Sequence, residues 1–252
     1  MRRVSAALYI VGLFLTGCGG TTTTDSASTA AESASSVITT PSAAPSPPVT
    51  PASPIGPASP ITESALDGLL LTPTEVDSAT GATGMTVAAT SNALATDIQV
   101  AADAPPEKIA CVGIAGTAEA QAYAGAGSTA VRDQVLQAPG DNGASRTAAQ
   151  SVILFESAQE ASAFVAESAE KWPSCKEFRG SSASSTVGPV ATKDGVVSTV
   201  ITTTDGNGAT VDCQRALTAA NNVVVEASAC GAATADAALT IAGRIAATIA
   251  EQ

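Results

Sequence analysis

Apolar residues recur at helical spacing in the second half of the chain. From Ala161 to Trp172 they follow one another at i, i+3, i+4 and i+11, which is the spacing of one helix face. Ser157 and Glu160 form a capping box directly before this stretch, and Pro173 directly follows it. The pattern therefore predicts a helix that begins after Ser157 and ends at Trp172.

Short apolar runs, bounded by Gly, Asp and Asn, predict strands around this helix. The clearest run, 149–155, ends in Val152-Ile153-Leu154-Phe155. The run 129–136 reads as a strand, although its spacing would also suit a short helix. Further strands are expected over 184–190, 196–204, 210–217 and 223–229.

Two more helices are expected at the ends of this region. Thr72 to Glu75 spell a capping box with Pro73 at the first helical position, so a short helix should run over 73–79. Thr234 can cap a last helix that carries a row of isoleucines on its buried side. Consecutive hairpins imply an antiparallel sheet whose apolar face is covered by helices, which is an α+β fold.

The N-terminus has the pattern of a targeting segment. Arg2 and Arg3 precede an apolar stretch over 4–15, which is long enough for a signal peptide but shorter than the ~20 residues of a membrane-spanning helix. The stretch ends in Leu-Thr-Gly-Cys18, which resembles the bacterial lipobox, where the cysteine is acylated and becomes the new N-terminus. We expect residues 1–17 to be a lipoprotein signal peptide and Cys18 to be lipidated. A plain secretory signal with an incidental cysteine is the alternative.

A linker separates this segment from the folded part. Residues 18–61 begin with Cys18 and continue in Thr, Ser, Ala and Pro, a composition that cannot bury enough apolar surface to fold. Residues 62–252 contain no second linker and are expected to form one domain. The layout predicts an extracytoplasmic domain that a lipid anchor holds at the outer face of the plasma membrane.

Composition excludes several functions. Without residues 1–17 the chain has nine basic and 23 acidic residues, a formal net charge of −14 that repels nucleic acid. It contains no histidine, so Ser-His-Asp and Cys-His catalysis are impossible. We expect no catalytic residues, no bound metal and no cofactor.

Four cysteines remain in the expected domain. If Asn221 and Asn222 form a two-residue hairpin turn, counting outward places Cys213 opposite Cys230 in a non-hydrogen-bonded pair, close enough for a disulfide. In an exported protein the remaining two would then pair, as Cys111–Cys175. A Cys₄ zinc site is the alternative, although the chain has no C-x-x-C spacing.

The same register places Arg215 diagonal to Glu226 on one face of the hairpin. They could form a surface ion pair, or they could be a charged pair that faces a ligand in a cleft. We take Arg215 and Glu226 as the candidate ligand-binding residues on this basis.

Several segments together resemble one family. They are the stretch 69–84, the order of the cysteines, Tyr123-Ala-Gly, Val152–Phe155 with its capped helix to Trp172-x-x-Cys175, and Cys213-Gln-Arg-Ala-Leu, Asn-Asn-Val-Val-Val and Ala-Cys230-Gly. They are similar to the extracellular sensor domain of mycobacterial PknH-type Ser/Thr kinases, which also occurs in stand-alone lipoproteins. The resemblance implies a twisted antiparallel sheet with helices, the two disulfides above and a large cleft for an unidentified ligand.

The expected function is therefore a non-enzymatic ligand-binding or sensor module of the mycobacterial envelope, with a small ligand or an envelope protein as partner. A lipid or glycolipid carrier is the alternative, and it would need a wide apolar cavity. We expect the chain to depart from the kinases in having neither a kinase domain nor a transmembrane helix.

Overall fold

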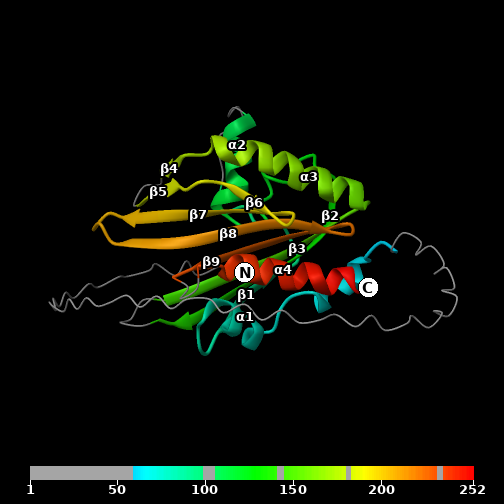
Figure 1. The fold of residues 1–252 in the computed structure, drawn as a ribbon, viewed down its shortest axis with the longest axis horizontal. Coiled ribbons are helices and arrows are strands. Elements are labelled where there is room, and N and C mark those ends of the chain that lie inside the picture. Colours follow the sequence, from blue (N-terminus) through cyan, green and yellow to red (C-terminus); the bar gives the residue numbers. More distant parts are fainter. Residues whose placement is uncertain (1–58, 99–105, 141–144, 180–182, 232–234) are drawn as a thin grey trace, which may run out of the picture. The chain divides into compact units, whose positions relative to one another are not determined.

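The computed structural model describes residues 59–98, 106–140, 145–179, 183–231 and 235–252. They form one compact unit with helices and strands in the following order (Figure 1). The elements are η1 (Glu63–Gly68), α1 (Pro73–Thr80), β1 (Thr86–Ser91), α2 (Pro106–Ala115), β2 (Ser128–Pro139), β3 (Ser145–Phe155), α3 (Ala158–Lys171), η3 (Trp172–Ser174), β4 (Glu177–Arg179), β5 (Ala183–Val187), β6 (Ala191–Lys193), β7 (Val196–Asp205), β8 (Thr210–Ala220), β9 (Val223–Cys230) and α4 (Ala237–Ala250).

All strands belong to one antiparallel sheet, so the predicted α+β class is confirmed. Its order is β1-β2-β3-β9-β8-β7-β5-β4, and β6 pairs with β7. The order follows the chain except where β3 lies next to β9 and where β5 lies next to β7. The pairing of β3 with β9 brings the two most apolar strands to the centre of the sheet.

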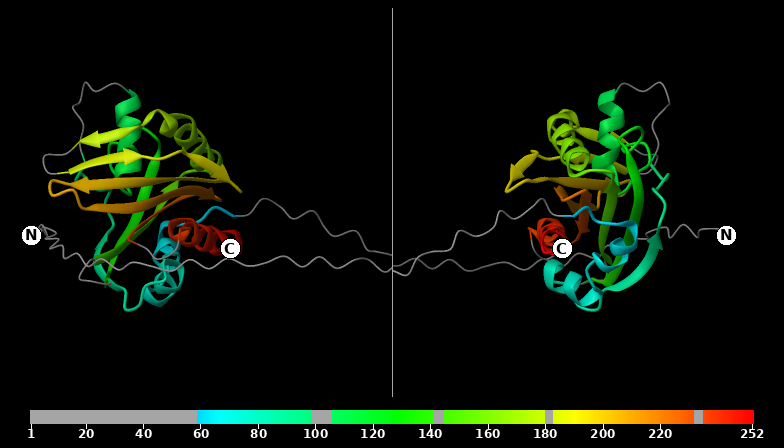
Figure 2. Two further views of the ribbon diagram at one scale, coloured as in Figure 1. Left: turned by 60° about the vertical axis from the view of Figure 1, so that its left-hand side comes forward. Right: turned by 90° about the vertical axis from the view of Figure 1, so that its right-hand side faces the viewer.

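Helices cover both faces of the sheet rather than the one apolar face that was predicted. Figures 1 and 2 show α2 and α3 on one side of the central strands and α1 and α4 on the other. The reason lies in the central strands, where consecutive apolar residues point alternately to opposite faces. Val152 and Val225 join the core under α1 and α4, whereas Ile153 and Val224 join the core under α2 and α3. A continuous apolar run is typical of a strand that is buried on both sides.

The β8–β9 hairpin has the register that the cysteines predicted. Asn221 has a φ of 51°, and Ala220 pairs with Val223 across the turn. Cys213 therefore pairs with Cys230, and their Cα atoms are 4.0 Å apart. The prediction succeeded because turn length and cysteine spacing both depend on this register.

Both predicted capping boxes are present. Thr72 donates its backbone N–H to Glu75 Oε2 over 2.8 Å, and Ser157 does the same to Glu160 Oε2 over 3.0 Å. These bonds explain where α1 and α3 begin. Thr234, the predicted cap of the last helix, lies outside the described residues. The predicted signal peptide and residues 18–58 of the predicted linker, Cys18 included, also lie outside them.

Some predicted bounds were wrong. The expected strand over 184–190 ends at Val187, because Pro189 has no N–H with which to continue the pairing. The run 129–136 is the strand β2, not a helix, and β2 extends to Pro139. Among the larger elements, β1 and α2 were not predicted.

Candidate functional site

Arg215 is buried between the sheet and α2. It lies on β8, is 1 % exposed and points to the end of α2, the end at which a helix leaves its last carbonyl groups unpaired. Its guanidinium donates to the carbonyl oxygens of Gly113 (2.6 Å), Ile114 (3.1 Å) and Gly116 (3.0 Å) and, on the sheet, of Ala227 (3.0 Å). A cation at this position also stabilises the negative end of the helix dipole. Arg215 therefore fixes α2 to the sheet.

Glu226 completes this buried network. Its Oε2 lies 3.5 Å from Arg215 Nη2 and accepts the Ala118 N–H over 2.6 Å, while its Oε1 accepts the Tyr123 hydroxyl over 2.9 Å. Burial raises the pKa of Glu226, and burial together with the nearby carboxylate raises the pKa of Tyr123 well above its ordinary value. The phenol therefore stays protonated and acts as a donor.

The two candidate residues are thus brought together, as the register predicted. Their side chains are 2 % exposed each, so the pair is not the surface ion pair that the sequence left open. Glu226 does line a pocket, whereas Arg215 lies behind it. Ligand contact by either residue stays a prediction.

A disulfide closes the same region. Cys111 on α2 is bonded to Cys175, which directly follows η3, with Cα atoms 5.6 Å apart. The bond ties α2 to the end of α3. Because all four cysteines are joined in two disulfides, the zinc alternative is wrong. Within the described ranges, no three His, Cys, Asp or Glu side chains are grouped so that they could hold a metal ion.

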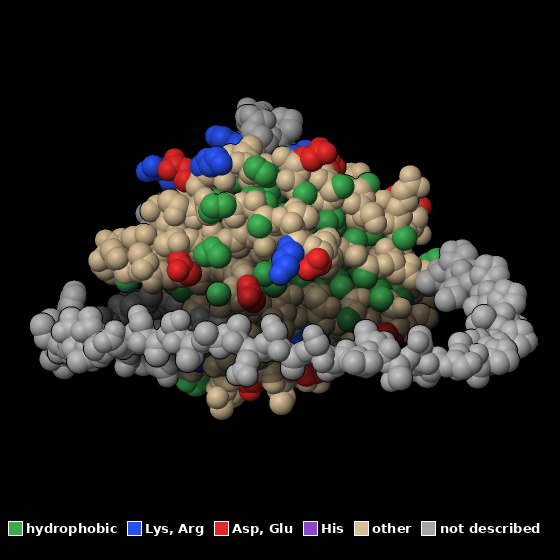
Figure 3. All heavy atoms as spheres, viewed as in Figure 1, with side chains coloured by type: hydrophobic (Ala, Val, Ile, Leu, Met, Phe, Trp, Pro, Cys, Tyr) green, Lys and Arg blue, Asp and Glu red, His purple; other side chains and the backbone are tan. Residues whose placement is uncertain are grey.

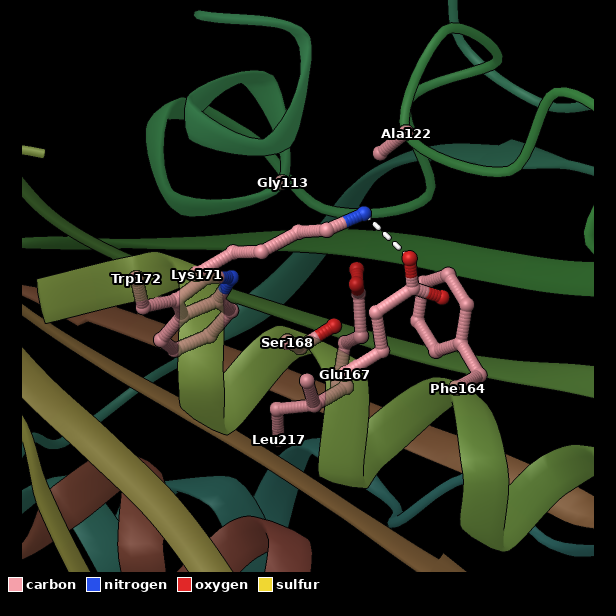
Figure 4. A pocket seen from close by; sticks show the side chains of 9 residues that line it. Gly113, Ala122, Phe164, Glu167, Ser168, Lys171, Trp172 and Leu217 are labelled. Carbon is pink, nitrogen blue, oxygen red and sulfur yellow. Dashed lines mark hydrogen bonds and ion pairs between the residues drawn. The ribbon is translucent and has the colours of Figure 1, made fainter. Parts of the chain in front are cut away.

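An inner pocket of about 50 Å³ lies between α2, α3 and the sheet, above Leu217 and Glu226. Figure 4 shows Lys171 crossing it from α3 to reach the carboxylate of Glu167. The pocket is lined by Gly113, Ala122, Phe164, Glu167, Ser168, Lys171, Trp172, Leu217 and Glu226.

A wider groove continues from this pocket toward solvent. It has a volume of about 290 Å³, and it shares Ala122, Phe164, Glu167 and Lys171 with the inner pocket. Ligand pockets typically measure about 300–1,000 Å³ and combine apolar walls with a few polar groups. Groove and inner pocket together form what we call the α2–α3 site, which is lined by the residues of the inner pocket and by Ile109, Gln121, Ala124, Gly125 and Ala126.

Trp172 lies on the helix face that its spacing predicted, and it is 1 % exposed. Its place beside a cavity was not predicted. Arg215 Cζ lies 6.0 Å from the centre of its ring. Yet its Nε1 borders the inner pocket, 3.8 Å from where a side chain at Gly113 would begin. Only the position of α2, which the sequence did not reveal, shows that this N–H faces a cavity.

A second groove, of about 580 Å³, lies beside β1 and β2. Its cation is already engaged, since Arg132 contacts Asp67 at 2.5 Å and Glu63 at 3.5 Å. On the face shown in Figure 3, the described Lys and Arg side chains lie beside Asp and Glu rather than in a patch of one sign. The α2–α3 site differs from this groove and from the face in Figure 3 because it extends to buried polar groups.

Comparison with known proteins identifies the domain. The family model of the PknH-like extracellular domain matches residues 61–248. The serine/threonine-protein kinases PknH of Mycobacterium bovis and Mycobacterium tuberculosis are each 32 % identical over 183 residues. The match covers 67 % of this chain but only 28 % and 27 % of the two kinases.

A solved structure agrees. The crystal structure of the extracellular domain of PknH from Mycobacterium tuberculosis superimposes with a TM-score of 0.67 at 29 % identity, over 77 % of this chain and 99 % of that one. The shared region is thus the extracellular part of the relatives. In the part of the present chain that the structure describes, no helix has the length and hydropathy to cross a membrane.

Proposed function

We propose that this chain, which belongs to the PknH-like extracellular domain family, is a non-enzymatic ligand-binding module that acts outside the plasma membrane. The matched part of the relatives is their extracellular domain, and the chain spans little more than a quarter of their length. What this chain does on its own is therefore argued from its α2–α3 site.

The observation that carries the proposal is the inner pocket. Its walls come from α2, α3 and the central strands, and its polar side chains come from α3, η3 and β9. Two connections hold these elements in place, the Cys111–Cys175 disulfide and the hydrogen bonds of Arg215. A pocket whose walls are fixed before binding loses little entropy when a ligand enters.

Non-enzymatic binding also fits the chemistry of the site. Tyr123 is held protonated and donates to Glu226, and Glu226 is committed to Ala118 and Arg215. None of these groups is poised to accept a proton from a substrate or to attack one. These hydrogen bonds maintain the shape of the pocket and do not set up a proton transfer.

The N-terminal segment supports the location. We propose that residues 1–17 are a signal peptide, that Cys18 carries the lipid anchor, and that the linker to residue 61 separates the domain of residues 62–252 from the outer face of the plasma membrane. Radiolabelled palmitate should enter the wild-type protein and be absent from Cys18→Ala. Equal incorporation into both would refute the anchor.

Native mass spectrometry tests the binding function. The full chain is purified gently from the envelope of a mycobacterial host. It should carry a small polar molecule that is released by denaturation and is absent from an organic extract of the same sample. A co-purifying lipid would instead support the carrier alternative. Hydrolysis of glycan or ester substrates that a single carboxylate substitution abolishes would overturn the non-enzymatic assignment.

A further inference from the structure

We infer that the α2–α3 site binds an uncharged hydroxylated ligand, a sugar or polyol, and that one of its oxygens enters the inner pocket and accepts the Trp172 indole N–H. The inference rests on the proposed binding function and names the ligand class. It starts from one atom, Trp172 Nε1. This N–H is a donor only, so it requires an acceptor.

Within the described residues Trp172 Nε1 has no hydrogen-bond partner, although the side chain is 99 % buried. Among those same residues, no fully buried side-chain nitrogen or oxygen is left unpaired. The Nε1 atom must therefore reach the pocket, which is the cavity that its side chain lines. The protein supplies no acceptor at this point, so the oxygen of a water molecule or of a ligand in the pocket can accept the Nε1 hydrogen.

The charges of the pocket favour a neutral ligand. Three charged side chains line it, and each already has a partner: Lys171 contacts Glu167, and Glu226 lies 3.5 Å from Arg215. A carboxylate or ammonium ligand would have to break one of these pairs or bury a charge without a partner. A hydroxyl group can accept from Trp172 and leave both pairs intact.

The surroundings favour several hydroxyl groups rather than one. Ser168 lines the inner pocket, and its hydroxyl can donate or accept. The outer groove adds the amide of Gln121 and the exposed Glu167–Lys171 pair. Beside these polar groups lies the flat ring of Phe164, stacked on Tyr123 at 4.4 Å between ring centres. Polar groups beside an aromatic ring suit a compact polyhydroxylated molecule better than an acyl chain.

Gly113 offers a way to fill the pocket without disturbing the fold. A Cβ at this position would lie 3.8 Å from Trp172 Nε1 and 3.4 Å from Ala122 Cβ, both ordinary contact distances. Gly113 lies inside α2, where alanine is the better helix former. Gly113→Ala should therefore keep the fold and occupy the place of the ligand oxygen. Gly243→Ala on α4 is the matched control, because a Cβ there meets nothing within 4 Å.

The chain contains a single tryptophan, so Trp172 fluorescence reports the pocket directly. Wild type, Gly113→Ala and Gly243→Ala are titrated with D-glucose, D-mannose, D-arabinose and glycerol as neutral probes, and with sodium acetate and methylammonium chloride as ionic probes. At least one neutral probe should give a saturable change in the wild type and in Gly243→Ala. Its apparent Kd should rise at least tenfold in Gly113→Ala and in Ser168→Ala.

Three results would overturn the inference: saturation by the ionic probes alone, equal affinity of Gly113→Ala for the neutral probe, or no saturable change with any probe. None of these results contradicts the proposed binding function if a polar molecule still co-purifies with the full chain. If nothing co-purifies and the sugars still saturate the fluorescence change, the inference stands while the physiological ligand remains to be found by another route.

Discussion

The cores on the two faces of the sheet consist of different kinds of side chain. The core under α1 and α4 contains only aliphatic side chains and Met85, and the buried polar groups beside it are uncharged, such as Gln150, which bonds both backbone groups of Leu71. The core under α2 and α3 holds the aromatic residues of the domain. The buried ion pair of Arg215 and Glu226 and the inner pocket lie on that face as well.

This difference separates stability from function. A dry aliphatic core stabilises through burial alone and tolerates small changes. A core that contains charges depends on each partner being present, because an unpaired charge is costly where water is excluded. We therefore expect the α2–α3 face to respond to single polar substitutions and the α1–α4 face to respond only to lost volume.

The largest effect is expected for Arg215→Met. The substitution leaves the Glu226 charge buried and removes the donor to three carbonyl groups of the α2 end. It should lower the free energy of unfolding in urea at neutral pH by about 3–5 kcal/mol. The double variant Arg215→Met/Glu226→Leu should recover part of this loss. If the double variant is less stable than the single one, the charge is not the cause.

The disulfides are expected to differ next. In the chain-entropy model, removing Cys111–Cys175 (sequence separation 64) should cost about 4 kcal/mol, and removing Cys213–Cys230 (separation 17) about 3 kcal/mol. Paired Cys→Ser variants, unfolded in urea, measure both values. The two variants should also differ in Trp172 emission, since only Cys111–Cys175 frames the inner pocket. Equal emission changes would contradict the role given to that bond.

How far the sequence predicts this architecture depends on how local each signal is. The β8–β9 hairpin and the start of α3 were predictable, because turn, cap and register lie within a few residues of one another. The edge strand β1 was missed because its Thr, Val, Ala and Ser residues are almost all exposed and have no period. The diagonal placement of Arg215 and Glu226 was predictable from the register of the hairpin. Their burial was not, because it depends on packing against α2, which is far away in the sequence.

A matched pair of smaller substitutions sharpens the comparison between the faces. Ile241→Val on α4 and Ile114→Val on α2 each delete one methylene-sized group from a fully buried side chain. Each should lower the free energy of unfolding by about 0.5–1.5 kcal/mol. Only Ile114→Val should shift Trp172 emission, since the backbone carbonyl of Ile114 bonds Arg215, which packs on the indole. A shift in Ile241→Val of the same size would mean that the two faces are not independent.

The smallest expected effect is the change of stability with pH, which should have opposite signs for one carboxyl group in each of the two regions. Burial, followed by the charges of Asp97, Glu226 and Asp133, raises the pKa of Glu119, which lies next to the network of Glu226. A carboxyl whose pKa is higher in the folded than in the unfolded state stabilises fully below the unfolded value, and this stability is lost as the pH rises through the folded pKa. Glu119→Gln, which keeps an acceptor for the Ile98 N–H, should therefore be more stable than the wild type at pH 7 and equal to it near pH 3.

Glu75, in the capping box of α1, gives the control with the opposite sign. Hydrogen bonds from Thr72 lower its pKa, so its stabilisation is present above the unfolded pKa and is lost as the pH falls through the folded value. Glu75→Gln should therefore be less stable than the wild type at pH 7, and the difference should again disappear in acid. Urea midpoints of the three proteins between pH 3 and pH 7 measure both trends. Parallel shifts of the two variants would show that a general loss of negative charge, and not the local environment of each carboxyl, sets the pH dependence.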